Sequence, residues 1–165
     1  MRFLLPAFAL LSLLFAGAIF GFFYAWVCST MWGLDAANPK VAIEAMQAMN
    51  ASVRNAVFAP AFFGTPVVLG VTAVLAWSAR RRLAAAAFGT GALVYLFGGL
   101  FLTATVNVPM NEALAEVSIP EATDAAREIW VAYSEPWQFW NQLRTAVSGA
   151  ALLLAGLGTL AVARA

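Results

Sequence analysis

The chain has 165 residues, of which 63% are hydrophobic and 10% charged, and its mean hydropathy is +0.83. About a quarter of the residues in a typical soluble domain are charged, so this composition excludes an ordinary soluble domain. The net charge of +1 gives no basic surface for nucleic acid. The chain has no histidine and a single cysteine. These counts exclude an intrachain disulfide, histidine-ligated metal or haem sites, and a Ser-His-Asp triad.

Four apolar runs are each long enough to cross a hydrocarbon core, which takes about 20 helical residues. The first run imitates a signal peptide at Ala16–Ala18, but it is longer than the 7–15 apolar residues of such a peptide. We therefore interpret it as a retained transmembrane helix. The sequence predicts one all-α membrane domain, residues 1–165, built as a four-helix bundle. The expected spans are residues 3–31, 56–77, 83–106 and 137–162, joined on one side by long loops at 32–55 and 107–136.

Both long loops are predicted to contain short helices that cap this end of the bundle. Turn residues precede Pro39, which is well placed to start a helix, and residues 40–54 have an amphipathic period. A second apolar stripe follows Pro120 and extends to Tyr133. We expect this second helix to lie across the end of the bundle.

Charge placement predicts the orientation. Arg2, Arg80–Arg82 and Arg164 fall on one side of a four-pass topology. The acidic residues all fall in the other two loops: Asp35, Glu44, Glu112, Glu116, Glu121, Asp124, Glu128 and Glu135. By the positive-inside rule, both termini are cytoplasmic and the long loops extracellular. The sequence thus predicts a multi-pass protein of the plasma membrane.

Arg144 is the most unusual residue of the last span. It follows Trp137 by seven residues, about 10 Å along a helix, and an arginine at the bilayer centre costs ~2.5–3.5 kcal/mol. Pro109 should free backbone carbonyls near residue 105. We expect the guanidinium to donate to these carbonyls, to Asn107 or Asn111, or to Glu112. Such a network either organises a ligand site or only fastens two helices together, and both alternatives stay open.

Other catalytic signals are weak. The sequence shows no nucleophile–base pair, no metal-ligand spacing and no glycine-rich phosphate loop, so we expect no metal and no cofactor. Cys28 is interpreted as a small apolar residue, and Glu112 and Glu135 as solvated loop charges.

Five stretches resemble the anthrone-oxygenase-like family of membrane proteins. They are Ala42–Asn50 with Asn55, Phe62–Thr65, the aromatic run Phe20–Trp26, Asn107-Val-Pro109-Met-Asn111, and Trp137-x-x-Trp140-Asn141-x-x-Arg144-Thr145. The resemblance implies four membrane helices, and fungal members oxidise anthrones to anthraquinones. Family members often carry histidine where Gln142 stands, so a histidine-dependent step does not transfer. The resemblance carries over Asn50, Asn55, Asn107, Pro109, Asn111, Trp140, Asn141 and Arg144.

Two functions from different classes follow. The first is a membrane module whose polar centre binds a hydrophobic aromatic ligand or a lipid, or which contacts a membrane-protein partner or a second copy. The alternative is a cofactor-independent oxygenase of anthrone-like substrates, so whether the protein is an enzyme stays open. Arg144, Asn107 and Asn111 would then stabilise an enolate oxygen. The remaining residues assigned to the polar centre are Asn50, Asn55, Pro109, Trp140, Asn141 and Tyr24. Coupled transport is disfavoured because the spans contain no acidic residue.

Overall fold

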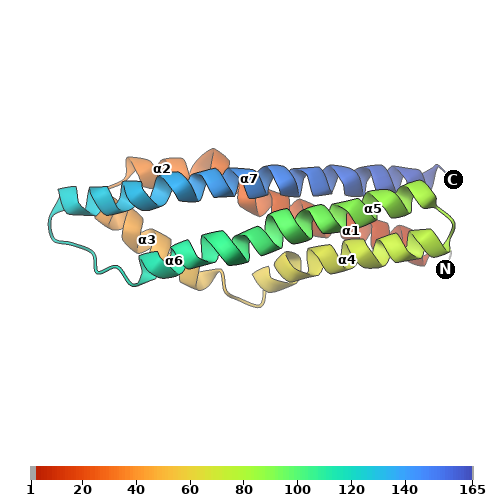
Figure 1. The fold of residues 1–165 in the computed structure, drawn as a ribbon, viewed down its shortest axis with the longest axis horizontal. Coiled ribbons are helices and arrows are strands. Elements are labelled where there is room, and N and C mark those ends of the chain that lie inside the picture. Colours follow the sequence, from red (N-terminus) through yellow and green to blue (C-terminus); the bar gives the residue numbers. More distant parts are fainter. Residues whose placement is uncertain (1–2, 165) are drawn as a thin grey trace.

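The computed structural model describes residues 3–164, and every regular element in that range is a helix. Four long rods lie side by side, with short helices at one end (Figure 1). In chain order the elements are α1 (Leu4–Ala25), the π-helical η1 (Trp26–Thr30), α2 (Met31–Ala36), α3 (Pro39–Ser52), α4 (Phe58–Ser78), α5 (Arg82–Tyr95), the π-helical η2 (Leu96–Phe101) and η3 (Thr103–Asn107), α6 (Val108–Ala115) and α7 (Thr123–Ala163). The predicted start of a helix at Pro39 is where α3 begins.

The rods form a closed ring of neighbours, because α1 and α5 each pack on both α4 and α7. Within residues 3–164, four helices are long and apolar enough to cross a membrane, at Leu4–Ala36, Phe58–Ser78, Arg82–Ala115 and Thr123–Ala163. The predicted all-α bundle of membrane-spanning length is therefore confirmed. The rods are longer than the apolar runs because the polar segments next to them are also helical, so the helix from Arg82 continues through Pro109 to Ala115.

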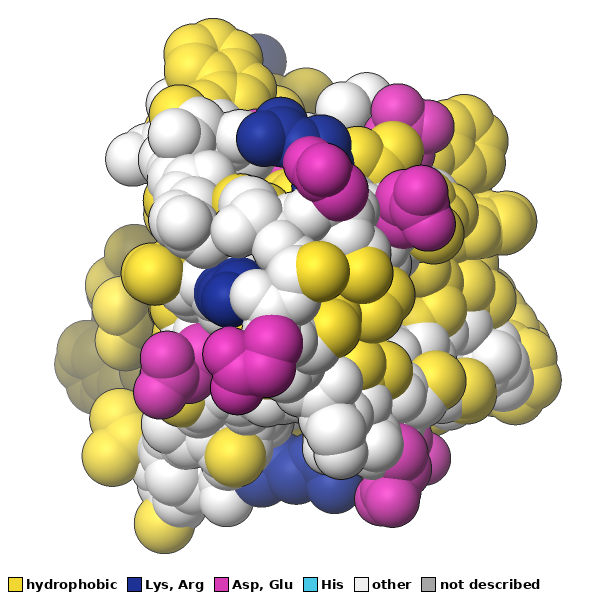
Figure 2. Space-filling view, turned by 90° about the vertical axis from the view of Figure 1, so that its left-hand side faces the viewer, with side chains coloured by type: hydrophobic (Ala, Val, Ile, Leu, Met, Phe, Trp, Pro, Cys, Tyr) yellow, Lys and Arg dark blue, Asp and Glu magenta, His cyan; other side chains and the backbone are white. Residues whose placement is uncertain are grey.

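The two ends of the bundle differ in charge. The end that contains α2, α3, α6 and the start of α7 holds all the acidic residues, and we call it the acidic end. Figure 2 looks onto this end and shows acidic and basic side chains across its face, with hydrophobic side chains at its flanks. The opposite end, which we call the basic end, holds the α4–α5 turn with Arg80–Arg82 and the last residues of α7.

α7 corrects one prediction. The segment after Pro120 was expected to lie across the end of the bundle, but it is the first part of a 41-residue helix that continues through Pro136. Its buried residues recur every three or four positions on both sides of that proline, whose own side chain is exposed. Because the buried stripe is uninterrupted, packing outweighs the one backbone hydrogen bond that a proline removes.

The acidic end has its own hydrophobic core. Met31, Ile43 and Met46 pack there with Trp130 and Trp137 of α7. Gln47 of α3 also donates to the backbone carbonyls of Leu114 and Val117, at 2.8 and 3.0 Å. Leu114 lies in the last turn of α6 and Val117 just beyond it, so these bonds hold α3 to the end of α6. The short helices α2 and α3, which we call the cap, are thus held to the rods by both apolar packing and hydrogen bonds.

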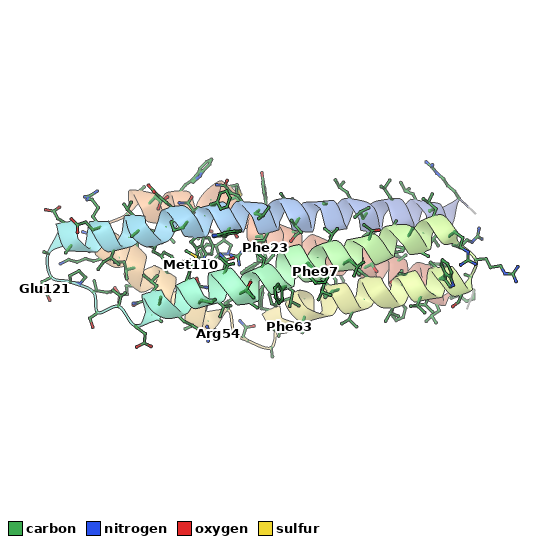
Figure 3. All side chains as sticks on the ribbon, in the orientation of Figure 1. Phe23, Arg54, Phe63, Phe97, Met110 and Glu121 are labelled. Carbon is green, nitrogen blue, oxygen red and sulfur yellow. The ribbon has the colours of Figure 1, made fainter. Side chains whose placement is uncertain are left out.

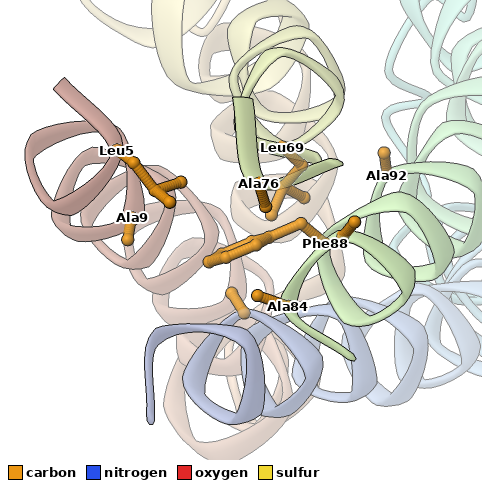
Figure 4. Close-up of a cluster of buried hydrophobic side chains, with 9 residues drawn as sticks. Leu5, Ala9, Leu69, Ala76, Ala84, Phe88 and Ala92 are labelled. Atoms are coloured by element: carbon orange, nitrogen blue, oxygen red, sulfur yellow. The ribbon is translucent and has the colours of Figure 1, made fainter. Parts of the chain in front are cut away.

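The core at the basic end is built around Phe88. This ring is fully buried and packs with Ala76, Ala84, Leu69 and other side chains from α1, α4, α5 and α7 (Figure 4). Close packing around a large ring leaves no space for additional atoms, which makes the neighbouring glycine sensitive to substitution.

We predict that Gly158→Ala destabilises the protein and that Gly156→Ala does not. A Cβ at Gly158 would lie 2.7 Å from the Phe88 ring, whereas nothing lies within 4 Å of a Cβ at Gly156. Overpacking typically costs about 1–3 kcal/mol, and alanine in an open helical position is favoured over glycine by roughly 0.5–1 kcal/mol. Free energies of unfolding measured in mixed micelles would test this, and equal values for the two variants would contradict the packing described here.

Candidate functional site

A cavity of about 510 Å³ lies where the long rods meet the cap. Its aromatic lining residues are Phe22, Phe23, Trp26, Phe58, Phe62, Phe63 and Trp137. The polar lining residues are Asn50, Arg54, Asn55, Thr103, Asn111 and Arg144. In Figure 3, Phe23 lies among the side chains between the rods, and Arg54 and Phe63 lie near the start of α4. The volume falls within the roughly 300–1,000 Å³ that is typical of small-molecule sites.

The cavity lies about one hydrocarbon thickness from the basic end. At 1.5 Å per residue, about 30 Å of helix separates the α4–α5 turn from Phe58 on one side and from Thr103 on the other. Counted from Arg164, the same length of α7 reaches Arg144. A bilayer whose hydrocarbon begins at the basic end therefore ends at the level of the cavity.

Arg144 reaches the cavity from α7 and is 5% exposed. Its Nε donates to Asn141 Oδ1 at 3.0 Å, and its Nη1 makes a longer contact of 3.4 Å with Thr103 Oγ1. The guanidinium also lies over two rings, 4.5 Å from the centroid of Phe23 and 5.0 Å from that of Trp137. Because arginine has five N–H donors, most of its hydrogen-bonding capacity is unused.

The unused donors of Arg144 are open to the cavity. Nη2 has no acceptor in the described part of the chain. The buried side-chain polar atoms without a partner, among the described residues, are the two amide atoms of Asn107. Nη2 is not one of them, so it keeps some exposed surface, and Arg144 is one of the residues that line the cavity. A ligand acceptor placed there would meet a pre-oriented pair of N–H groups.

The position of the guanidinium is fixed by Asn141. This amide is 1% exposed, and its Nδ2 donates to the backbone carbonyl of Phe23 at 3.2 Å. That bond turns Oδ1 toward Arg144. Asn141 does not line the cavity, so we assign it the positioning of Arg144.

The charge of Arg144 is not neutralised within the described residues. The ion pair found there joins Arg54 and Glu112 at 3.2 Å, and both of these side chains are about 60% exposed. No lining residue of the cavity is acidic. A buried charge is costly unless it is paired, and Arg144 has no carboxylate partner among the lining residues.

Asn111 joins the wall of the cavity to the cap. Its Oδ1 accepts hydrogen bonds from Tyr133 Oη at 2.8 Å and from Trp137 Nε1 at 2.9 Å. Tyr133 Oη in turn accepts a longer bond of 3.4 Å from Asn50. This chain of hydrogen bonds ties α3, α6 and α7 together beside the cavity, and it fixes the Trp137 ring that lines it.

The mouth of the cavity lies at the turn between α3 and α4. The exposed residues of its lining are Arg54, Asn55, Ala56 and Phe63. Asn55 shapes this turn, because its Oδ1 accepts from the backbone N–H groups of Val57 and Phe58 at 2.9 and 3.0 Å. An apolar molecule can thus enter beside the first turn of α4.

The structure brings together some of the predicted site residues and not others. Arg144, Asn111, Asn50 and Asn55 line the cavity. Arg144 donates to Asn141 and Thr103 and not to the partners expected from sequence. Asn111 is occupied by Tyr133 and Trp137, and Glu112 by Arg54. Asn107, the other expected acceptor, is not bonded to Arg144.

Four other predicted residues lie outside the cavity wall. Asn107 is fully buried on the rod between Thr103 and Asn111, and its amide has no partner among the described residues. Pro109 is exposed, and Trp140 is half-buried against the ring of Phe139. Tyr24 is 49% exposed and stacks on Phe20. None of these four residues is among the residues that line the cavity.

Sequence reasoning missed several contributors. Tyr133 was placed on an apolar stripe, yet its hydroxyl bridges Asn50 and Asn111. Asp35 was assigned to a turn, yet it lies in α2 and accepts hydrogen bonds from Trp130, Ser134 and Gln138 at 2.7–2.9 Å. The i, i+4, i+8 spacing of these three donors on α7 was the available signal, since it places them on one face of a helix.

The fold and the cavity define a four-helix membrane protein with an aromatic site that contains an uncompensated arginine. The chain belongs to the anthrone oxygenase family, because the family model described as Anthrone oxygenase matches residues 54–154. That range includes Arg144, Thr103, Asn111 and Asn141, whereas α1 and α3 lie outside it. Comparison with curated proteins and with solved structures gave no match.

Proposed function

We propose that the cavity binds an anthrone-like aromatic substrate as its enolate and that the protein is an oxygenase of such substrates. The observation that carries this proposal is the uncompensated charge of Arg144 inside an aromatic cavity. A fused aromatic ring system suits the walls, and one anionic oxygen suits the free Nη2 donors. Family membership supports the same substrate class.

The proposed role of Arg144 is electrostatic. An anthrone loses a methylene proton to become an enolate, and its negative charge develops on the carbonyl oxygen. Donors that are already oriented toward such an oxygen favour the anion without reorganisation. A hydrogen bond to a charged group is worth about 1.5–3 kcal/mol, and the apolar rings around it lower the local dielectric, which strengthens it.

The proposed reaction balances with O₂ as the only co-reactant. The enolate carbon transfers one electron to O₂, and the resulting radical and superoxide combine to form a C–O bond. Protonation gives a hydroperoxide, and loss of water from this group leaves a second carbonyl. The net change is anthrone plus O₂ to anthraquinone plus water. Because no lining residue is a carboxylate, the first proton leaves through the open mouth to solvent.

We further propose that the acidic end, with the cavity mouth, faces the outside of the plasma membrane. The arginines of the α4–α5 turn and Arg164 lie at the opposite end, where the positive-inside rule places the cytoplasm. A hydrophobic substrate would then enter from the outer membrane interface.

The test is oxygen uptake by the purified full chain with anthrone as substrate. We expect a rate above that of protein-free micelles and one O₂ consumed per anthraquinone formed. With ¹⁸O₂, one labelled oxygen atom should appear in the quinone and the other in water. Uptake equal to that of protein-free micelles would refute the oxygenase, while retained binding of an anionic aromatic would leave the protein a ligand binder.

A further inference from the structure

We propose that a second site, at the basic end, binds the phosphate group of an anionic phospholipid. A hollow of about 370 Å³ lies between the α4–α5 turn and the end of α7. It is lined by Arg80, Arg81, Arg164, Leu83, Ala84 and Ala161. The wall thus combines three guanidinium-bearing residues with three apolar ones. This site is distinct from the cavity at Arg144 and does not depend on the function proposed for it.

The charge at this hollow is strongly one-sided. All acidic side chains of the chain lie at the acidic end, and about 45 Å of helix separates Arg82 from Glu112 or Arg164 from Glu135. This distance is several times the Debye length of about 8 Å at physiological salt. Arg80 and Arg164, which both line the hollow, therefore act together on an anion without an acidic side chain near them.

The backbone that carries these arginines is well defined. The α4–α5 turn closes with backbone hydrogen bonds from Arg80 to Trp77 and from Arg81 to Ala76, at 3.0 and 2.9 Å. Next to the hollow, the guanidinium of Arg82 stacks on the Trp77 ring, 3.5 Å from its centroid. Figure 3 shows nitrogen-tipped side chains extending from this turn beyond the rods. The turn thus presents its positive charge at a fixed level of the bundle.

The apolar half of the hollow distinguishes a lipid from a free anion. Leu83, which lines the hollow, is 74% exposed. Trp77, on which Arg82 stacks, does not line the hollow and is 60% exposed. Both residues lie on helices long and apolar enough to cross a membrane. Tryptophan is typical of the membrane interface. Basic pockets between transmembrane helices on the cytoplasmic side bind anionic head groups. A phospholipid would place its phosphate on the arginines and its acyl chains along α5 and α7.

The test is native mass spectrometry of the full chain in detergent with dioleoyl phosphatidylglycerol, dioleoyl phosphatidylcholine or inorganic phosphate. We expect the anionic lipid to bind in preference to the zwitterionic one. Arg80→Ala/Arg164→Ala should weaken its binding about 30-fold, given the contribution of each arginine near a membrane surface. Arg127→Ala removes an exposed arginine at the acidic end and should change nothing. Arg80→Lys/Arg164→Lys should retain most of the binding.

Competition with inorganic phosphate shows whether the site binds a lipid head group or free phosphate. No displacement of phosphatidylglycerol by millimolar phosphate would assign the site to a lipid head group, and displacement would assign the same arginines to free phosphate. Equal binding of the two lipids, or loss of less than about twofold in the double alanine variant, would overturn the proposal.

Discussion

Arg144→Met is expected to lower the affinity for an anionic aromatic ligand such as anthracene-9-carboxylate by about 100-fold, while the protein still folds. The affinity falls because the variant loses a charged hydrogen bond in a buried site, which is worth about 1.5–3 kcal/mol, together with the attraction of the charge itself. Equilibrium binding followed by ligand fluorescence measures this change.

The free energy of unfolding of Arg144→Met shows whether Arg144 serves a ligand site or only holds two helices together. Replacing a buried, unpaired charge with an apolar residue of similar volume is often neutral or stabilising. The loss of the bond to Asn141 and of the ring contacts opposes this gain. We therefore expect the free energy of unfolding to change by less than about 2 kcal/mol. Arg127→Met serves as a control for removing an exposed arginine. A loss of about 3–5 kcal/mol in Arg144→Met with unchanged binding would identify Arg144 as a fastener.

Asn111→Leu is expected to be the most destabilising change in the hydrogen-bonded chain above the cavity. It removes the acceptor for two buried donors, Tyr133 Oη and Trp137 Nε1. Each unsatisfied buried donor costs about 1–3 kcal/mol, so the two donors together give an expected loss of roughly 2–6 kcal/mol in the free energy of unfolding. Unfolding in mixed micelles of increasing denaturing detergent measures it.

A double-mutant cycle tests the cause of that loss. Tyr133→Phe removes one of the two donors, so it should cost less than Asn111→Leu, and the double variant should cost less than the sum of the two single changes. Glu112→Gln, at the neighbouring exposed position, is the control. Strict additivity of Asn111→Leu and Tyr133→Phe would show that the bond between these residues contributes nothing.

The sequence predicts the bundle well because its main determinant is apolar length. Four runs of about 20 or more apolar residues have few alternatives to membrane-spanning helices. The start of α3 at Pro39 follows from equally local chemistry. Arg144 is recognisable from sequence because a charged residue within an apolar run is costly and therefore unusual. Each of these features depends on residues that are close together in the chain.

The cavity and the course of α7 depend on contacts that the sequence alone does not specify. Pro136 is a local signal for a helix break, but packing of Trp130, Tyr133 and Trp137 on the cap keeps α7 continuous. The partners of Arg144 were wrong for a similar reason. Asn111 has one amide oxygen, and two donors of α7 already occupy it. The competition among donors for one acceptor becomes visible only when α6 and α7 are placed side by side.

The most direct test of an uncompensated arginine is the affinity of the wild-type protein for two aromatic ligands of one shape and different charge. Anthracene-9-carboxylate and anthracene-9-carboxamide have the same ring system, and only the first is an anion. We expect the carboxylate to bind at least about tenfold more tightly, as a charged hydrogen bond to Arg144 requires. Equal or tighter binding of the carboxamide would show that the charge of Arg144 is not available to a ligand.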